Sequence, residues 1–165
     1  MRYLGDLGIS LAQIGAHAAA RTAFEIVIAS PSSFLVRTNA ILELMDLESG
    51  VDNRVAFERL RAEAESARDR MPPSMMADYL FKLGQGLARF GKVTRAREVL
   101  SEGMRLSETS GLNAWYFKIE RALQSLGSGP TDTREPKHSA PAGLSELPAV
   151  QEVALGLREY ALSTA

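Results

Sequence analysis

Residues 1–30 of this chain recur, in register and without a gap, at residues 77–106. Nine positions are identical, far more than composition alone should give, and most of them carry a small or an apolar residue. The identical pairs are Tyr3/Tyr79, Leu4/Leu80, Leu7/Leu83, Gly8/Gly84, Leu11/Leu87, Ala12/Ala88, Gly15/Gly91, Ala20/Ala96 and Arg21/Arg97. A pattern repeated at a fixed offset predicts a repeated structural unit, so this duplication constrains the fold more than any other feature of the chain.

Within each copy, apolar residues recur at the three- and four-residue spacing of an amphipathic helix, and a glycine interrupts the pattern midway. Gly15 and Gly91 stand where a tight turn between two helices needs a positive φ. Few segments show the alternation typical of a strand, so the sequence predicts an all-α protein. The expected helices cover residues 2–14, 17–29, 33–48, 53–70, 74–90, 93–107, 112–126 and 148–163.

Three local features refine this prediction. Ser49-Gly50-Val51-Asp52 separates the third and fourth helices, and Asp52 is the expected N-cap of the fourth. On that fourth helix, Arg54–Glu58 and Arg61–Glu65 have i,i+4 spacing, which predicts ion pairs on a solvated face. Gly84 is expected to let two helices approach closely. Gly84-Gln85-Gly86 could begin the G-x-G-x-x-G pattern of a nucleotide-binding loop, but Arg89 occupies the sixth position, where that pattern requires glycine.

The repeated unit reads Leu-x2-Leu-Gly-x2-Leu, then Gly four residues on, then Ala-x3-Phe or Ala-x3-Leu. This pattern resembles the tetratricopeptide repeat (TPR), a helix–turn–helix unit of about 34 residues. Leu replaces the usual Trp and Tyr in both copies, and Pro31 supplies the closing proline in the first copy only. The copies lie 76 residues apart, so the unit between them, roughly 33–71, is expected to be enlarged or irregular.

The resemblance implies a right-handed superhelical stack of about three TPR-like helix pairs over residues 1–126. The helix at 112–126 is expected to cap the stack, because it combines an apolar stripe with a polar outer face. Residues 127–143 have the composition of a flexible linker, rich in Gly, Pro and Ser. Residues 144–165 then form a tethered amphipathic helix with Val150, Val153, Ala154, Leu157 and Ala161 on one stripe.

In the TPR family, the first helix of each pair lines a concave groove that binds peptides or partner helices. The resemblance places seven candidate partner-binding residues in that groove: Arg2, Ile9, Gln13, Asp78, Phe81, Gln85 and Arg89. Gly5 and Ile9 fill the positions at which one subclass of the family clamps acidic C-terminal peptides through Lys and Asn. The resemblance therefore does not extend to that activity.

Composition narrows the class of partner. Nineteen basic and twenty acidic residues give a net charge of −1, so no global field attracts nucleic acid or an anionic membrane. The chain has no cysteine, which excludes disulfides and thiolate metal sites and fits the reducing cytoplasm that we expect for it. No stretch has the apolar length of a membrane span, and the first residues lack the pattern of a signal peptide.

The sequence predicts neither catalysis nor a cofactor. His17 and His138 are the only histidines, and neither has a second ligand at metal-binding spacing, so we expect no metal site. No serine stands in a G-x-S-x-G elbow, and no Walker-type phosphate loop is present. We therefore expect a protein that is not an enzyme, with no catalytic residues and no cofactor-binding residues.

Two functions are consistent with these features. The first is a scaffold or adaptor that binds a protein or peptide partner in the groove. The alternative is a peptide- or ligand-sensing regulatory domain of a bacterial transcriptional regulator or signalling protein, on fold analogy alone. No capping element precedes the first repeat, so we expect that edge to meet a partner or a second copy in a homo-oligomer, or the chain to be a piece of a longer protein.

Overall fold

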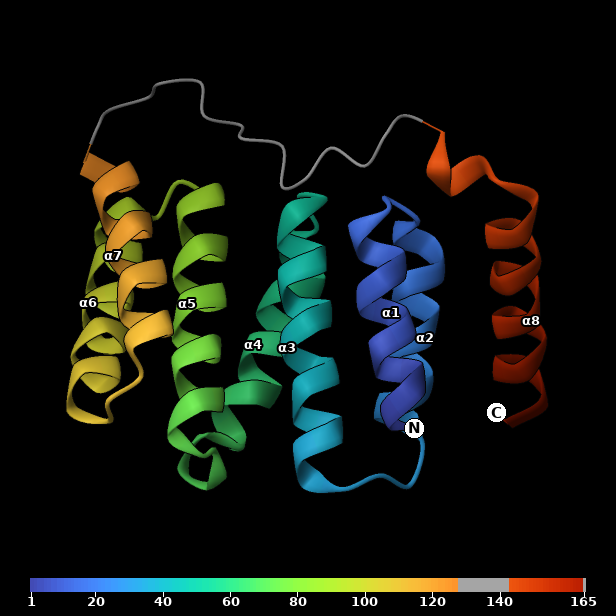
Figure 1. The fold of residues 1–165 in the computed structure, drawn as a ribbon, viewed down its shortest axis with the longest axis horizontal. Helices are drawn as coiled ribbons and strands as arrows, with labels where there is room; N and C mark the ends of the chain where they lie inside the picture. The colour runs from blue at the N-terminus through green and yellow to red at the C-terminus, as the bar shows by residue number, and fades with distance from the viewer. Residues whose placement is uncertain (128–142, 165) are drawn as a thin grey trace. The chain divides into compact units, whose positions relative to one another are not determined.

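The structure is a computed structural model that describes residues 1–127 and 143–164. Every regular element within those residues is helical, so the all-α prediction is confirmed (Figure 1). The α-helices are α1 (Arg2–Gln13), α2 (His17–Ala29), α3 (Phe34–Gly50), α4 (Arg54–Ser66), α5 (Pro73–Arg89), α6 (Val93–Thr109), α7 (Asn113–Gly127) and α8 (Pro148–Thr164). Two short 3-10 helices, η1 (Arg68–Arg70) and η2 (Leu144–Glu146), precede α5 and α8.

The predicted helices agree with the observed ones to within about two residues at most ends. The exception is the fourth, predicted to continue to residue 70, which ends at Ser66. There the N–H of Ala67 bonds the carbonyl of Ala64, three residues back, and the chain tightens into η1. Gly127, assigned to the linker in the sequence, is the last residue of α7, and Gly143, also assigned to the linker, directly precedes η2; residues 128–142 of the predicted linker lie outside the described residues.

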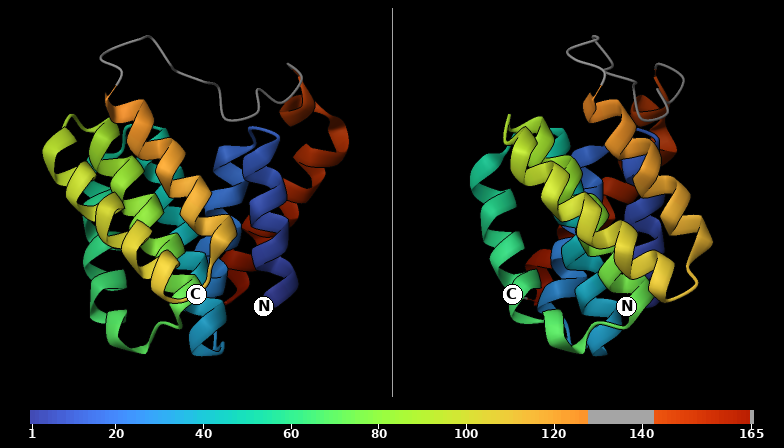
Figure 2. Two further views of the ribbon diagram at one scale, coloured as in Figure 1. Left: turned by 60° about the vertical axis from the view of Figure 1, so that its left-hand side comes forward. Right: turned by 90° about the vertical axis from the view of Figure 1, so that its left-hand side faces the viewer.

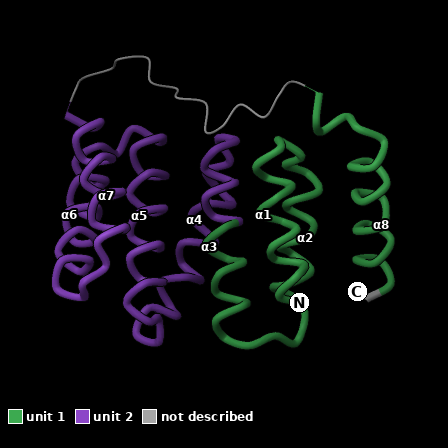
Figure 3. The backbone as a smooth tube through the Cα atoms, in the orientation of Figure 1, with its two compact units in different colours: residues 1–43, 132–165 green, residues 44–131 purple. Residues whose placement is uncertain are grey.

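The chain divides into two compact units, which Figure 3 colours separately. Unit 1 contains residues 1–43 together with 132–165, and unit 2 contains residues 44–131. The boundary falls inside α3, between Glu43 and Leu44. The predicted repeat array of residues 1–126 is thus shared between both units, and α8 is grouped with the first hairpin.

Unit 1 is built on the α1–α2 hairpin, whose two helices pack along each other. Its core contains Leu11 of α1 and Ala20, Ala23, Phe24 and Val27 of α2, all buried. The helix α8 packs against α2. Leu157 is its buried residue, at the centre of the apolar stripe predicted from the sequence.

Unit 2 is centred on α5, which packs against α4, α6 and α7. The views in Figures 1 and 2 show α5, α6 and α7 side by side. Phe57 and Leu60 of α4, Leu80 of α5 and Leu100 of α6 are almost fully buried. Ile119, on the apolar stripe predicted for α7, is also fully buried.

The same turn follows a helix at four places in the described chain. One residue after the C-cap adopts a left-handed backbone, with φ of 80° at Gly15, 60° at Asp52, 76° at Gly91 and 67° at Gly111. The next N–H then bonds a carbonyl five residues back: Ala16 to Leu11 at 2.9 Å, Asn53 to Glu48 at 2.9 Å, Lys92 to Leu87 at 2.8 Å and Leu112 to Ser107 at 2.8 Å. This is the Schellman motif, which satisfies the last carbonyls of the helix.

Asp52 is therefore not the N-cap of α4, and that prediction is wrong. The helix α3 continues through Gly50, so the left-handed position falls on Asp52, a residue type that tolerates it. Asn53 caps α4 instead, because its side-chain carbonyl accepts a hydrogen bond from the N–H of Ala56 at 3.3 Å.

The duplication in the sequence corresponds to a duplicated helix contact. A Cβ built on Gly8 would lie 2.6 Å from a ring atom of Phe24, and one built on Gly84 would lie 2.5 Å from Cγ of Leu100. Phe24 and Leu100 occupy the same position of the repeat, sixteen residues after each glycine. The predicted packing role of Gly84 is confirmed, because the absent side chain is what allows α5 to approach α6.

Replacing Gly84 with alanine should destabilise the protein by about 1–3 kcal/mol, because the new methyl group would overlap the buried Leu100 side chain. The free energy of unfolding, measured by urea denaturation, tests this. Gly5→Ala is the matched control: a Cβ at Gly5 would meet no atom within 4 Å, so this substitution should stabilise α1 by up to about 1 kcal/mol. Equal effects of the two substitutions would contradict the packing argument.

Candidate interaction surfaces

The seven residues predicted to line a groove lie on two helices. Arg2, Ile9 and Gln13 lie on α1 in unit 1, where Arg2 and Gln13 are exposed and Ile9 is half-buried. The other four lie on α5 in unit 2.

On α5, the two charged groove candidates are paired with neighbouring side chains. The carboxylate of Asp78 accepts a hydrogen bond from Nζ of Lys82 at 2.7 Å, and both side chains are largely buried. The Arg89 guanidinium bonds the carboxylate of Asp46 at 2.9 Å and the hydroxyl of Ser49 at 2.5 Å. These contacts fix the orientation of both charged groups.

Phe81 differs from the expectation for a groove residue, because α7 covers its ring. The side chain is 7% exposed and belongs to a buried cluster with Leu100 and Ile119. The Trp115 ring lies 6.0 Å from it, and Nζ of Lys118 lies 4.4 Å from its centroid. Phe81 therefore contributes to the core of unit 2, as the sequence of α5 alone could not reveal.

Gln85 carries the one buried side-chain oxygen without a hydrogen-bond partner among the described residues. A buried acceptor left unpaired typically costs about 1–3 kcal/mol. Of the four candidates on α5, Gln85 is thus the one with a buried side-chain atom that lacks a partner, and that atom is enclosed by the protein.

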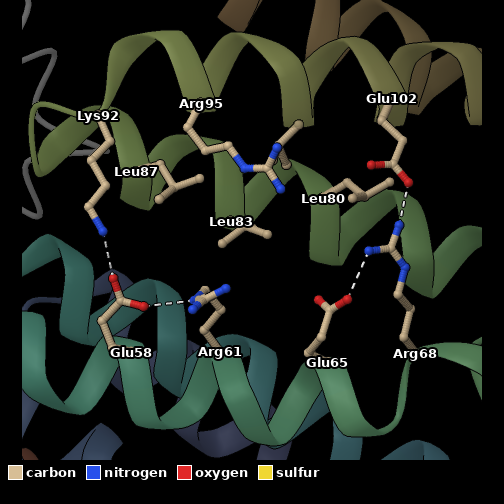
Figure 4. Close-up of a pocket in the computed structure, with 11 residues that line it drawn as sticks. Glu58, Arg61, Glu65, Arg68, Leu80, Leu83, Leu87, Lys92, Arg95 and Glu102 are labelled. Atoms are coloured by element: carbon tan, nitrogen blue, oxygen red, sulfur yellow. Dashed lines mark hydrogen bonds and ion pairs between the residues drawn. The ribbon is translucent and has the colours of Figure 1, made fainter.

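A second surface of unit 2 is a cleft of about 410 Å³ between α4, α5 and α6 (Figure 4). Its floor is apolar and its walls are charged. The floor consists of Leu80, Leu83, Leu87 and Val99, and the walls carry Glu58, Arg61, Glu65, Arg68, Lys92, Arg95 and Glu102. We call it the α4–α6 cleft.

Two ion-pair bridges cross this cleft. Glu58 of α4 bonds Nζ of Lys92 at 2.9 Å and Nε of Arg61 at 2.7 Å. Arg68 bonds Glu65 at 2.9 Å and also pairs with Glu102 of α6. These ion pairs connect α4 and η1 to the α5–α6 hairpin by charge as well as by packing.

These bridges change the acidity of both glutamates. Partial burial favours the neutral form of Glu58, but hydrogen bonds from Lys92 and Arg61 outweigh that effect and hold its pKa below the usual 4.5. Partial burial likewise opposes ionisation of Glu65, and hydrogen bonds from Tyr79 and Arg68 again lower its pKa. Both carboxylates are therefore more acidic in the folded protein than in the unfolded chain.

Tyr79 of α5 bonds one of the cleft glutamates. It is fully buried, and its hydroxyl donates a hydrogen bond to Glu65 at 2.5 Å. Burial, followed by the bond to the Glu65 carboxylate, raises the pKa of the Tyr79 phenol well above its ordinary value. The phenol consequently stays protonated, and so a hydrogen-bond donor, at neutral pH.

Sequence spacing did not identify these bridges. It predicted the pairs Arg54–Glu58 and Arg61–Glu65 along α4, whereas Arg61 pairs with Glu58 and Glu65 pairs with Arg68. Glu58 and Glu65 instead turn toward residues of α5 and α6. The many acidic and basic residues on α4 were the available sequence signal for ion pairing, but they did not indicate which helix lies opposite α4.

The described residues contain no group of three His, Cys, Asp or Glu side chains placed to hold a metal ion. His17 is exposed at the first residue of α2, and His138 lies outside the described residues. Within the same residues, no helix has both the length and the apolar character needed to cross a membrane.

No protein family, curated protein or solved structure matches this chain. The structure alone therefore indicates the class of protein to which the chain belongs. The described part is an all-α protein of helical hairpins, two of which repeat the same turn and the same glycine contact.

The two cleft glutamates should make stability sensitive to acid. Their pKa values are lower in the folded state, so their stabilisation is fully present above the ordinary value of 4.5 and is lost as the pH falls through the folded values. The double substitution Glu58→Gln and Glu65→Gln should flatten this dependence in urea denaturation at a series of pH values. Glu25→Gln, at an exposed position of α2, is the control and should keep it. An unchanged acid dependence in the double variant would contradict the assignment.

Proposed function

We propose that this protein is a non-enzymatic interaction module of the TPR type, in which stacked helical hairpins present a surface to a protein or peptide partner. The observation that carries the proposal is the equivalence of the α1–α2 and α5–α6 hairpins. Both have the same left-handed turn, the same turn hydrogen bond and a glycine facing the same position of the next helix. Repetition of one hairpin is how solenoid proteins build an extended binding surface.

The chemistry of α5 favours a peptide or helix as the ligand over a polyanion. Along one face, α5 carries the Asp78–Lys82 ion pair, the unpaired carbonyl oxygen of Gln85 and the Arg89 guanidinium. The Gln85 oxygen is buried and the Asp78–Lys82 pair is largely buried, so Arg89 is the group of this face that a polypeptide could reach, and the paired charges leave no excess of positive charge. On α1, Gln13 occupies the position equivalent to Arg89 and is also exposed.

Site-specific photocrosslinking tests this proposal. A photoreactive amino acid is placed at Gln13 and at Arg89, and the two control sites are Glu25 of α2 and Ser101 of α6. The control sites are exposed and occupy equivalent positions on the second helix of each hairpin.

We expect one protein in extracts of the source cells to crosslink from the first pair of sites and not from the second. After purification, that protein should bind the wild-type chain in a defined ratio, and Arg89→Glu should weaken the complex about tenfold or more. Crosslinks that arise equally from all four sites, or only from the second helices, would overturn the proposed surface.

A further inference from the structure

The α4–α6 cleft is closed at each end by an ion pair and is open in the middle. Glu58 and Lys92 pair across one end, and Arg68 and Glu102 pair across the other. Figure 4 shows both pairs, with Leu83 on the floor between them. The middle of the cleft is therefore the part that a ligand can enter.

Two arginines reach this opening, one from each wall. Figure 4 shows Arg61 of α4 and Arg95 of α6 extending toward the space over Leu83. Nε of Arg61 bonds Glu58, and its two terminal nitrogens have no hydrogen-bond acceptor among the described residues. Arg95 uses one terminal nitrogen for Glu98, an exposed residue that does not line the cleft. Both guanidinium groups thus retain a pair of N–H donors for a ligand.

The lining of the cleft carries one more cation than anion. Its cations are Arg61, Arg68, Lys92 and Arg95, and its anions are Glu58, Glu65 and Glu102. The three carboxylates all accept bonds from the first three cations. The surplus charge is that of Arg95, whose surface pair with Glu98 is exposed on both sides and therefore weak. A ligand with one negative charge would balance the lining, whereas the three carboxylates would repel a polyanion.

The floor of the cleft requires a hydrocarbon ligand. It consists of Leu80, Leu83, Leu87 and Val99, all buried, and it offers no polar side-chain atom to the amide groups of a peptide. Leu83 and Leu87 are four residues apart on α5, which is about 6 Å along a helix. An extended chain advances about 1.2 Å per bond, so about five bonds lead from the arginines to the far end of the floor.

We propose that the α4–α6 cleft binds a small aliphatic monocarboxylate of about six carbons. Its carboxylate lies between Arg61 and Arg95, each of which can donate two parallel N–H bonds. Its alkyl chain lies on Leu83 and Leu87, where it is removed from water. The cleft volume of about 410 Å³ is within the range of small-molecule sites, about 300–1,000 Å³. None of the seven groove candidates lines the cleft, so this proposal and the proposed function can fail separately.

The test is a titration of the isotope-labelled full-length protein with hexanoate, followed by amide chemical shifts in NMR. For so small a ligand we expect saturable binding with a Kd on the order of 1 mM. The largest shifts should fall on the amides of Leu83, Leu87 and Arg95. Arg61→Gln and Arg95→Gln should each weaken binding about fivefold, because each removes a charge-assisted pair of hydrogen bonds.

Arg59→Gln is the matched control, because it removes the same charge from an exposed position of α4 outside the cleft; it should bind as the wild type does. Acetate, which lacks the alkyl chain, and 1-hexanol, which lacks the charge, should each bind about tenfold more weakly than hexanoate. Because Arg95 is exposed, its substitution should leave the urea midpoint unchanged, which separates lost binding from lost folding.

Three results would overturn the proposal: no saturable binding, equal affinity for hexanoate and 1-hexanol, or shifts located away from the cleft. Unchanged affinity in Arg95→Gln would also overturn it. So would tighter binding of a short peptide that ends in leucine with a free carboxylate, because the cleft would then recognise the terminus of a protein.

Discussion

The distance between paired helices at Gly8 and Gly84 is the constraint on which both hairpins depend. At these positions the side chain of the second helix, Phe24 or Leu100, occupies the space in which a Cβ would stand. The left-handed residue after the first helix reverses the chain within a few residues and directs the second helix onto that glycine. The turn and the glycine are both needed. A methyl group at the glycine position would hold the two helices apart even when the turn has formed, and the core between them would then be loosely packed.

Once the α5–α6 hairpin is closed, α4 and α7 cover it by different means. The helix α7 adds apolar surface, with Ile119 buried among Phe81 and Leu100. The helix α4 combines apolar contact through Phe57 with the charge bridges of the α4–α6 cleft. Ion pairs at partly exposed positions contribute little net stability, so their main effect is to select the orientation of α4 over others.

Much of the local structure could be predicted from the sequence because it depends on nearby residues. The helical ranges, the turns at Gly15 and Gly91 and the close approach at Gly84 all follow from spacing and residue type. Asp52 shows the limit of such reasoning. A carboxylate ahead of a helix is a common cap, but α3 extends far enough that Asp52 falls in the left-handed position and Asn53 caps α4. Where a helix ends depends on a balance of small energies that residue type alone does not fix.

The candidate surfaces also combine features that the sequence determined with features that only the tertiary structure decided. The sequence determined that the chain is helical, that one hairpin is built twice, and that Tyr3 and Tyr79 are equivalent. Only the tertiary structure decided that Phe81 is covered by α7, that Glu58 pairs with Lys92, and that Tyr79 is buried while Tyr3 is exposed. Helix formation and turns are local, so the repeat pattern specifies them. Burial and pairing depend on which helix lies opposite, and identical residues acquire different environments when one helix has a neighbour and its copy does not.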